Sequence, residues 1–239
     1  MARNKSSLRE IEERFDNDVE RFANLETGQQ TTLDAKFNLE LITAGIARRY
    51  PDLKTVLDIG CGAGNYDVRL LQRINAPLEL TLVDLSQPML DKAKERIAAI
   101  RDSEVILVKG DFRAAPLKQQ HYEVIIATAV LHHLRDDDDW REAFKKLHSL
   151  LKPGGSLWVF DMVEHADPKM QDFIYREKYG EYLTALKDEA YRDHVFAYIE
   201  KEDSPTSLMY QCELLKQVGF SSVDILHKKL NFASFVAFA

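Results

Sequence analysis

Short apolar runs alternate along this chain with segments whose apolar residues recur at helical spacing. The apolar runs, which are typical of buried strands, lie at 56–59, 80–84, 105–108, 124–130 and 156–160. Helical faces follow the second and fourth runs, and they carry Leu90, Ala93, Ile97 and Ile100, then Trp140, Ala143, Phe144, Leu147 and Leu151. A later helix face with Leu208, Cys212 and Leu215 precedes two more strands, at 222–226 and 231–238. This alternation predicts an α/β fold in which helices cover both faces of a sheet.

Two segments fall outside the alternation. Residues 1–52 are predicted to be helical, with turns at 15–18 and 27–30 and a helix face that carries Leu39, Ile42, Ile46 and Tyr50. We interpret 1–52 as an N-terminal helical cap and 53–239 as one domain. Residues 162–206 form an insertion after the fifth strand, and one helical face of it carries Tyr175, Tyr179, Tyr182 and Leu186. Such stripes usually belong to the core, but an insertion above the carboxyl ends of parallel strands often closes a substrate pocket, so we expect a substrate lid.

The loop after the first strand is the most informative motif. Asp58 lies near the end of the apolar run, and Gly60, Gly62 and Gly64 follow at alternate positions. Glycines let the backbone approach a ligand closely, and the helix start that follows presents free N–H groups. A dinucleotide fingerprint, G-x-G-x-x-G/A, would place its last small residue where Asn65 stands. The carboxylate of Asp58 would repel a pyrophosphate and attract a positively charged ligand, so the loop favours S-adenosylmethionine over NAD or FAD.

The sequence resembles the class I S-adenosylmethionine-dependent methyltransferases over roughly residues 53–161. The loop matches the family's acidic residue followed by G-x-G-x-G, and further segments match in order at 80–84, 110–112, 124–133 and 150–157. The resemblance implies a Rossmann-like, seven-stranded, mostly parallel sheet whose last strand is antiparallel and lies beside the fifth. It also implies a cofactor site made by Asp58, Gly60, Cys61, Gly62, Gly64, Asp84, Leu85, Asp111, Phe112, Thr128 and Ala129.

Two carboxylates have defined roles in the site that the resemblance implies. Asp84 accepts hydrogen bonds from both ribose hydroxyls, and Asp111 accepts one from the adenine amino group. Charge-assisted bonds of this kind are roughly twice as strong as neutral ones. In the alternative interpretation Asp84 only caps the following helix, for which Ser86 is the better candidate because Pro88 follows in the first turn.

His132 and His133 are the candidate catalytic residues. They follow the fourth strand, where a side chain can face the transferred methyl group, and an imidazole suits proton removal from oxygen or nitrogen. In the structural alternative, one ring points into the helical layer and the other into solvent.

Two other groups of polar residues follow the fourth and fifth strands and could also form a site. Asp161, Glu164 and His165 form a second candidate cluster just past the fifth strand. The acidic run 136–139 invites a metal interpretation, but the negative charge is better explained by a helix N-terminus before Trp140. No metal site is therefore predicted.

The C-terminal part adds an alternative activity. Residues 215–220 and 230–237 loosely resemble the end of the carboxy-S-adenosylmethionine synthase lineage, which uses this fold to carboxylate the cofactor's methyl group during modification of the tRNA wobble uridine. That chemistry requires an arginine near the methyl group, and Arg192 in the insertion is the candidate. The primary prediction is an enzyme that transfers the methyl group to a small molecule by in-line displacement. A nicotinamide-dependent oxidoreductase and a non-catalytic cofactor-binding protein are further alternatives.

Composition narrows the choice of partners. With 239 residues, of which 45% are hydrophobic and 30% charged, the chain is long enough to bury one substantial core. The formal net charge of −7 disfavours a nucleic-acid partner. The two cysteines indicate no disulfide framework, and neither a signal peptide nor a membrane-spanning stretch is recognised, so a cytoplasmic, soluble protein is expected. The oligomeric state stays open, and a homodimer is compatible with the sequence.

Overall fold

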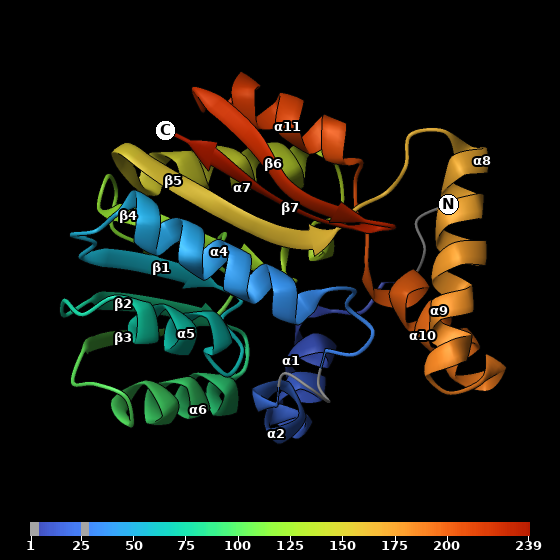
Figure 1. Ribbon diagram of the computed structural model, residues 1–239, viewed down its shortest axis with the longest axis horizontal. Helices are drawn as coiled ribbons and strands as arrows, with labels where there is room; N and C mark the ends of the chain where they lie inside the picture. Colours follow the sequence, from blue (N-terminus) through green and yellow to red (C-terminus); the bar gives the residue numbers. More distant parts are fainter. Residues whose placement is uncertain (1–4, 25–28) are drawn as a thin grey trace.

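In the part of the chain that the computed structural model describes, residues 5–24 and 29–239, seven strands form one sheet (Figure 1). The strands run in the order β3-β2-β1-β4-β5-β7-β6. Their bounds are β1 (Thr55–Ile59), β2 (Glu79–Asp84), β3 (Glu104–Lys109), β4 (Tyr122–Thr128), β5 (Leu151–Met162), β6 (Ser222–Lys229) and β7 (Phe232–Phe238). Neighbours among β1 to β5 are parallel, whereas β7 is antiparallel to both β5 and β6. The expected Rossmann-like sheet is therefore confirmed. Positions 27 and 28 of the turn predicted at 27–30 lie outside the described residues.

Helices cover both faces of the sheet. One face carries α4 (Ala35–Arg49), α5 (Asn65–Arg73) and α6 (Gln87–Ala98), and the other carries α7 (Asp137–Leu150) and α11 (Leu208–Gln217). Strand side chains alternate between the two cores, so that Val56 joins the first and Leu57 the second. The predicted apolar faces of α6, α7 and α11 are buried. Two assignments differ: Ile100 follows the end of α6 and is 37% exposed, and Leu151 begins β5.

Helix α4 packs on the sheet, although the sequence placed it in a cap. Ile42 and Ile46 are fully buried in the same core as the strands. Gly45 brings the helix so close to β5 that a Cβ at this position would lie 2.8 Å from the Trp158 ring. Of the segment expected as a cap, α1 (Leu8–Asn17) and α2 (Val19–Ala23) are the helices that lie near the carboxyl ends of the parallel strands (Figure 1).

The insertion after β5 is helical, as expected, and stands beyond the carboxyl ends of the parallel strands (Figure 1). It contains α8 (Pro168–Gln171), a π-helical stretch η2 (Asp172–Tyr179), α9 (Gly180–Leu186) and α10 (Glu189–Glu202). Of the predicted face, Tyr175 and Tyr179 are buried, whereas Leu186 is exposed. The Tyr179 hydroxyl donates a hydrogen bond to the Thr31 carbonyl over 2.7 Å. The first part of the stripe is therefore core, and it fastens the insertion to the N-terminal segment.

Polar contacts hold α1 between the sheet and the insertion. Oδ1 of Asp16 accepts a hydrogen bond from the Ser86 hydroxyl over 2.6 Å, at the start of α6. In the last turn of α1, Arg14 pairs with Glu202 of α10 over 3.0 Å. Helix α1 thus joins two parts of the fold that are far apart in sequence. Across the described residues, every helix is too short or too polar to span a lipid bilayer.

Candidate active site

The glycine loop leaves β1 with its backbone in the left-handed region. Gly60 and Gly62 have φ angles of 66° and 51°, which side chains rarely tolerate. A Cβ on Gly60 would lie 2.7 Å from Val130, whereas one on Gly62 would meet nothing within 4 Å. The loop is therefore tightly packed at Gly60 and open at Gly62, where the backbone can approach a ligand.

Asp84, at the end of β2, faces this loop. Its Oδ2 accepts a hydrogen bond from the Gly62 N–H over 2.8 Å, and its Oδ1 accepts one from the Ser86 N–H over 2.9 Å. Burial raises the pKa of Asp84, and these N–H groups oppose the rise. The Ser86 hydroxyl itself accepts from the Met89 N–H over 3.3 Å, so Ser86 is the cap of α6, as predicted.

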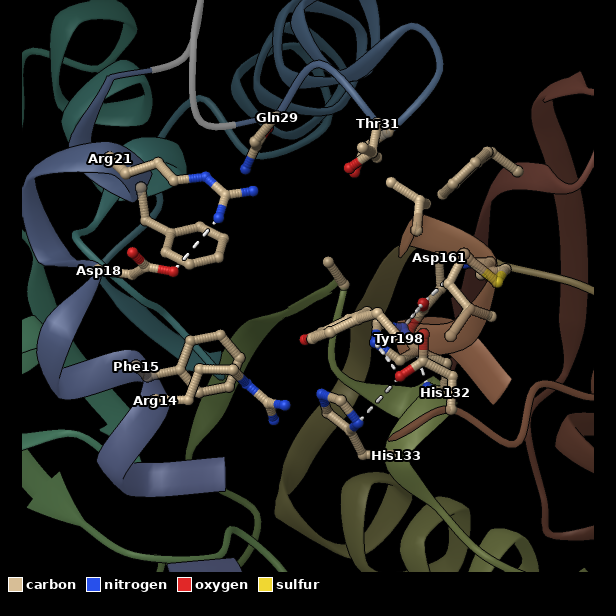
Figure 2. A pocket seen from close by; sticks show the side chains of 18 of the residues that line it. Arg14, Phe15, Asp18, Arg21, Gln29, Thr31, His132, His133, Asp161 and Tyr198 are labelled. Carbon is tan, nitrogen blue, oxygen red and sulfur yellow. Dashed lines mark hydrogen bonds and ion pairs between the residues drawn. The ribbon is translucent and has the colours of Figure 1, made fainter. Parts of the chain in front are cut away.

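Three neighbouring cavities lie at the carboxyl edge of the sheet. The loop cavity, about 130 Å³, is lined by predicted cofactor residues, namely Gly60, Cys61, Gly62, Asp84, Leu85, Thr128 and Ala129. The edge cavity, about 270 Å³, shares Asp84 and Leu85 with it and adds Asp111 and Phe112. The large cavity, about 520 Å³, is lined by the N-terminal helices, the ends of β4 and β5, and the insertion (Figure 2). His133 lines all three cavities and marks their junction.

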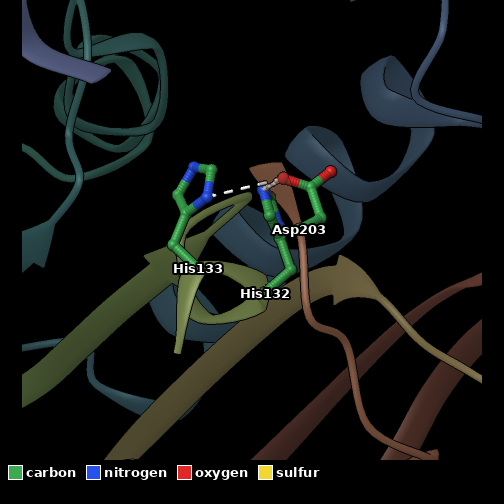
Figure 3. A group of neighbouring side chains, drawn as sticks. All are labelled: His132, His133 and Asp203. Atoms are coloured by element: carbon green, nitrogen blue, oxygen red, sulfur yellow. Dashed lines mark ion pairs between the residues drawn. The ribbon is translucent and has the colours of Figure 1, made fainter. Parts of the chain in front are cut away.

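His132 and His133 line the large cavity (Figure 2), and Asp203 lies beside both rings at its wall (Figure 3). The histidines belong to a 3-10 turn after β4, Leu131–His133. Asp161, at the end of β5, fixes this turn, because its Oδ2 accepts from the Leu131 N–H over 2.7 Å and its Oδ1 is bound to Nδ1 of His132. Oδ1 of Asp203, just past α10, lies 3.6 Å from Nε2 of His132 and 3.5 Å from Nδ1 of His133. The cluster thus draws on three segments that are distant in sequence.

The two imidazoles differ in charge. Burial disfavours the charged form of His132, but the carboxylates of Asp161 and Asp203 outweigh it and raise the pKa of His132 to about 9. At His133, burial and the positive charge of His132 lower the pKa well below its usual value. Burial raises the pKa of Asp203 to about 6, even though His132 opposes the rise. At neutral pH, His132 is therefore the cation of the cluster, and His133 is neutral.

Comparisons with known proteins agree with this geometry. The family model described as a methyltransferase domain matches residues 56–155. The chain is also 30% identical over 175 residues to the 2-phytyl-1,4-naphtoquinone methyltransferase of Nostoc punctiforme (strain ATCC 29133 / PCC 73102). The aligned region covers 70% of this chain and 72% of that protein. The chain belongs to the S-adenosylmethionine-dependent methyltransferases.

Two other similarities bear on this methyltransferase. It is 29% identical over 200 residues to the carboxy-S-adenosyl-L-methionine synthase of Trichodesmium erythraeum (strain IMS101), across 80% of this chain and 75% of that protein. The crystal structure of the CurJ carbon methyltransferase matches with a TM-score of 0.65 at 20% identity, over 92% of this chain. This chain spans 60% of that solved chain, and the likeness shows the fold.

Asp58 and Gly64 were expected in the methyltransferase cofactor site, but neither lines the cavities described above. Asp58 is 1% exposed and lies beside Asp67 of α5, which is fully buried. Burial and the neighbouring Asp67 raise the pKa of Asp58 well above its usual value, because two buried carboxyl groups this close disfavour ionisation of both. The structure places Asp58 away from the cavities, and its role toward the ligand stays a prediction. Gly64 is needed for packing, because a Cβ there would lie 3.0 Å from Ala93.

Two other predicted binding residues are already paired. Asp111 reaches the edge cavity, but its Oδ2 accepts hydrogen bonds from Nε and Nη2 of Arg113 over 2.9 and 2.6 Å. Its role toward adenine stays a prediction. Arg192, nominated as a carboxylate partner, pairs with the adjacent Asp193 over 2.8 Å and does not line the large cavity. Arg14 and Arg21 of the N-terminal helices line it instead (Figure 2).

The remaining candidates separate into different environments. Asp161 belongs to the histidine cluster, whereas Nδ1 and Nε2 of His165 contact Gln171 and Lys228 over 3.3 and 3.1 Å. Glu164 lines a separate hollow beside the insertion and does not line the large cavity. In the acidic run, the Asp136 carboxylate accepts from the N–H of Asp139 over 2.9 Å and caps α7, so the interpretation as a helix start is confirmed.

Sequence reasoning missed Asp203 and the two cavity arginines. Asp203 stands in the run Glu202-Asp203-Ser204-Pro205, which reads as an ordinary helix end. Arg14 and Arg21 belong to charged helical segments in which no local pattern distinguishes a cavity residue from a solvated one. These residues reach the site because α1, α2 and α10 fold over the same edge of the sheet.

Proposed function

We propose that this enzyme transfers the methyl group of S-adenosylmethionine to a small-molecule acceptor held in the large cavity. The cofactor would occupy the loop and edge cavities, which share Asp84 and Leu85. The observation that carries the proposal is the position of His133, which lines both of these cavities and the large one. Donor and acceptor would meet there for an in-line displacement. Such positioning contributes roughly 7–11 kcal/mol in favourable cases.

The lining of the large cavity favours an acceptor with a flat apolar body and a negatively charged or electron-rich group. Its aromatic side chains are Phe15, Phe22, Phe160, Tyr179, Tyr191, Tyr198 and Phe232. Arg14 and Arg21 add positive charge on the N-terminal side (Figure 2). Nε and Nη2 of Arg14 are buried without a hydrogen-bond partner. The name of the Nostoc relative, a 2-phytyl-1,4-naphtoquinone methyltransferase, is consistent with an aromatic acceptor.

Within this proposal, His132 and His133 contact the attacking atom of the acceptor. Both rings line the large cavity; Asp161 is bound to Nδ1 of His132, and Oδ1 of Asp203 lies 3.6 Å from Nε2 of His132 and 3.5 Å from Nδ1 of His133. Asp161 is a positioning residue, since its carboxylate also accepts from the N–H groups of the turn that carries the histidines. The insertion supplies Tyr191 and Tyr198 to the wall of the same cavity, which supports its role as a substrate lid.

The test is a transfer assay with S-adenosylmethionine labelled in its methyl group and a panel of phenols, quinols and aromatic carboxylic acids. Tyr191→Ala removes a ring from the large cavity and should raise the KM for the acceptor, while the Kd for S-adenosylmethionine stays unchanged. Tyr210→Ala is the control, because Tyr210 lies on α11 and does not line the three cavities. Tighter binding of NAD than of S-adenosylmethionine in calorimetry would refute the proposal and favour the oxidoreductase alternative.

Formation of carboxy-S-adenosylmethionine is the second candidate, because similarity to a synthase of that compound extends over 80% of the chain. The additional carboxylate needs a positive partner, and Arg14 lies on the cavity wall near His133 (Figure 2). Mass spectrometry of the nucleoside that copurifies with the protein separates the two candidates. The carboxylated cofactor is heavier than S-adenosylmethionine by the mass of carbon dioxide, and its recovery would replace the primary proposal.

We place the reaction in the cytoplasm. The two cysteines of the sequence, Cys61 and Cys212, are buried free thiols, which is usual in a reducing compartment. Fractionation of cells that produce the protein tests this location, and recovery from the periplasm or the medium would contradict it.

A further inference from the structure

Three ligand atoms converge at the wall of the large cavity with the spacing of a metal site (Figure 3). Oδ1 of Asp203 lies 3.6 Å from Nε2 of His132 and 3.5 Å from Nδ1 of His133, and three ligand atoms, one from each residue, lie within 4.8 Å of one another. Tetrahedral zinc with bonds of about 2.0–2.1 Å holds neighbouring ligand atoms about 3.3–3.4 Å apart. The side chains would need to move by only a few tenths of an ångström along two of these edges to hold such an ion.

The hydrogen bonding of the cluster leaves ligand atoms free. Nδ1 of His133 and Oδ1 of Asp203 are buried and have no hydrogen-bond partner. Buried polar atoms of this kind are rare in folded proteins and call for a ligand or another explanation. Nδ1 of His132 is bound by the Asp161 carboxylate, which leaves Nε2 of the same ring directed toward Asp203. A carboxylate that orients a histidine in this way is the usual outer partner of a metal-bound imidazole.

Two carboxylates near the cluster suit a cation. Three positive side chains also act on it, and Lys5 among them donates to the backbone carbonyls of Glu200 and Asp203. Asp161 and Asp203 together carry two negative charges, and a divalent ion would displace the proton on Nε2 of His132 and take its place as the positive charge that these carboxylates stabilise. The positive side chain closest in sequence, Arg135, is turned to backbone oxygens, because its Nη1 and Nη2 donate to the carbonyls of Glu202 and Ser6 over 2.6 and 3.3 Å. Arg14 is held by the Glu202 carboxylate over 3.0 Å.

We propose that Nε2 of His132, Nδ1 of His133 and Oδ1 of Asp203 bind one divalent transition-metal ion, for which zinc is the best fit. Two imidazoles and a carboxylate with a remaining open position form a ligand set of catalytic zinc sites. The open position would face the large cavity. If the proposed methyl transfer holds, it would bind an oxygen or sulfur atom of the acceptor and bring that atom toward the methyl group. The metal site itself does not depend on that reaction.

The test is calorimetric titration of zinc into chelator-treated protein without S-adenosylmethionine. The wild type should bind one ion per chain. Asp203→Asn and His133→Gln should each weaken binding by at least about a hundredfold, and Asp161→Asn should weaken it by about 10–100-fold, the effect of losing an outer partner. His227→Gln is the matched control, since this imidazole pairs with another carboxylate, Asp34, over 3.0 Å at a different place. It should bind zinc as the wild type does.

Two further measurements make the result decisive. Zinc should raise the Tm of the wild type but not that of Asp203→Asn, because a ligand that binds only the folded state stabilises it. Cobalt(II) should give the visible absorption of a four-coordinate site in the wild type and in His227→Gln, but not in Asp203→Asn. Equal zinc affinity in the wild type and in a folded Asp203→Asn protein would overturn the proposal. Titration of S-adenosylmethionine is carried out separately, so failure of the metal site and failure of the methyltransferase proposal remain distinguishable.

Discussion

The N–H of Gly62 donates a hydrogen bond to the Asp84 carboxylate over 2.8 Å. The bond joins the glycine loop after β1 to the end of β2. The same carboxylate lines both the loop cavity and the edge cavity. Asp84 is therefore placed to bind a ligand and, at the same time, to hold the loop in one conformation.

Replacement of Asp84 should weaken cofactor binding. Asp84→Ala removes an acceptor of charge-assisted hydrogen bonds, and the expected loss is about 1.5–3 kcal/mol of binding free energy. Calorimetric titration with S-adenosylmethionine measures it, and Asp102→Ala, an exposed carboxylate outside the cavities, is the control. An affinity equal to that of the wild type would show that Asp84 does not bind the ribose.

The Asp58–Asp67 pair should make stability depend on pH. The pKa of Asp58 is raised in the folded state by burial and by Asp67. A carboxyl group of this kind contributes stability that is complete below its unfolded pKa, near 4, and is lost as the pH rises through its folded pKa. Asp58→Asn needs no proton to pair with Asp67. Relative to the wild type, the variant should therefore gain stability as the pH rises above about 4.

Urea unfolding from pH 4 to pH 8 measures this gain. The difference in unfolding free energy between Asp58→Asn and the wild type should increase with pH. Asp102→Asn, which removes an exposed carboxylate, should show no such trend. A difference that stays constant over the whole range would mean that Asp58 is not held protonated in the folded protein.

The ion pair between Arg14 and Glu202 should stabilise the packing of α1 against α10 beside the large cavity. Glu202 is 1% exposed, and Arg14 is 29% exposed. Removing one partner of a buried pair costs 3–5 kcal/mol, and the partial exposure of Arg14 lowers the expectation for Arg14→Met to about 2–3 kcal/mol. The cost arises because, among the described residues, Glu202 would keep the Ser6 hydroxyl, over 2.6 Å, and the more distant Lys201 ammonium, over 3.9 Å.

A double-mutant cycle with Arg14→Met and Glu202→Gln, followed by urea unfolding, measures the coupling. The control cycle uses Arg9 and Glu13 on the same helix, whose side chains are 85% and 60% exposed. Their coupling should be much smaller, because water screens exposed pairs. Strictly additive effects of Arg14→Met and Glu202→Gln would show that the pair does not fasten α1 to α10.

Much of the fold could be predicted because its signals are local. The apolar runs at 56–59 and 80–84 became β1 and β2, and Ser86 caps α6 as its sequence context indicated. For helix α4, local signals predict the helix but not its packing. The spacing of Ile42 and Ile46 predicts a helix, but the close approach of Gly45 to Trp158 depends on the whole sheet.

The candidate site also contains residues that local signals predict and residues whose surroundings depend on the whole fold. The loop from Gly60 to Gly62 and the carboxylate of Asp84 could be located from the sequence, because each lies directly after a strand whose carboxyl end meets the others at one edge. The burial of Asp58 beside Asp67 could not be predicted, because it depends on how α5 packs against β1.

The sequence by itself determined the succession of strands and helices along the chain, the glycine loop and the family, since these depend on periodicity and on short motifs. The tertiary structure alone decided which charged residues meet. It brought Asp203 to His132 and His133, and Arg14 to the large cavity. The physical reason is that these contacts join segments far apart in the chain, and the energies of burial and charge that govern them are set by the neighbours that folding assembles.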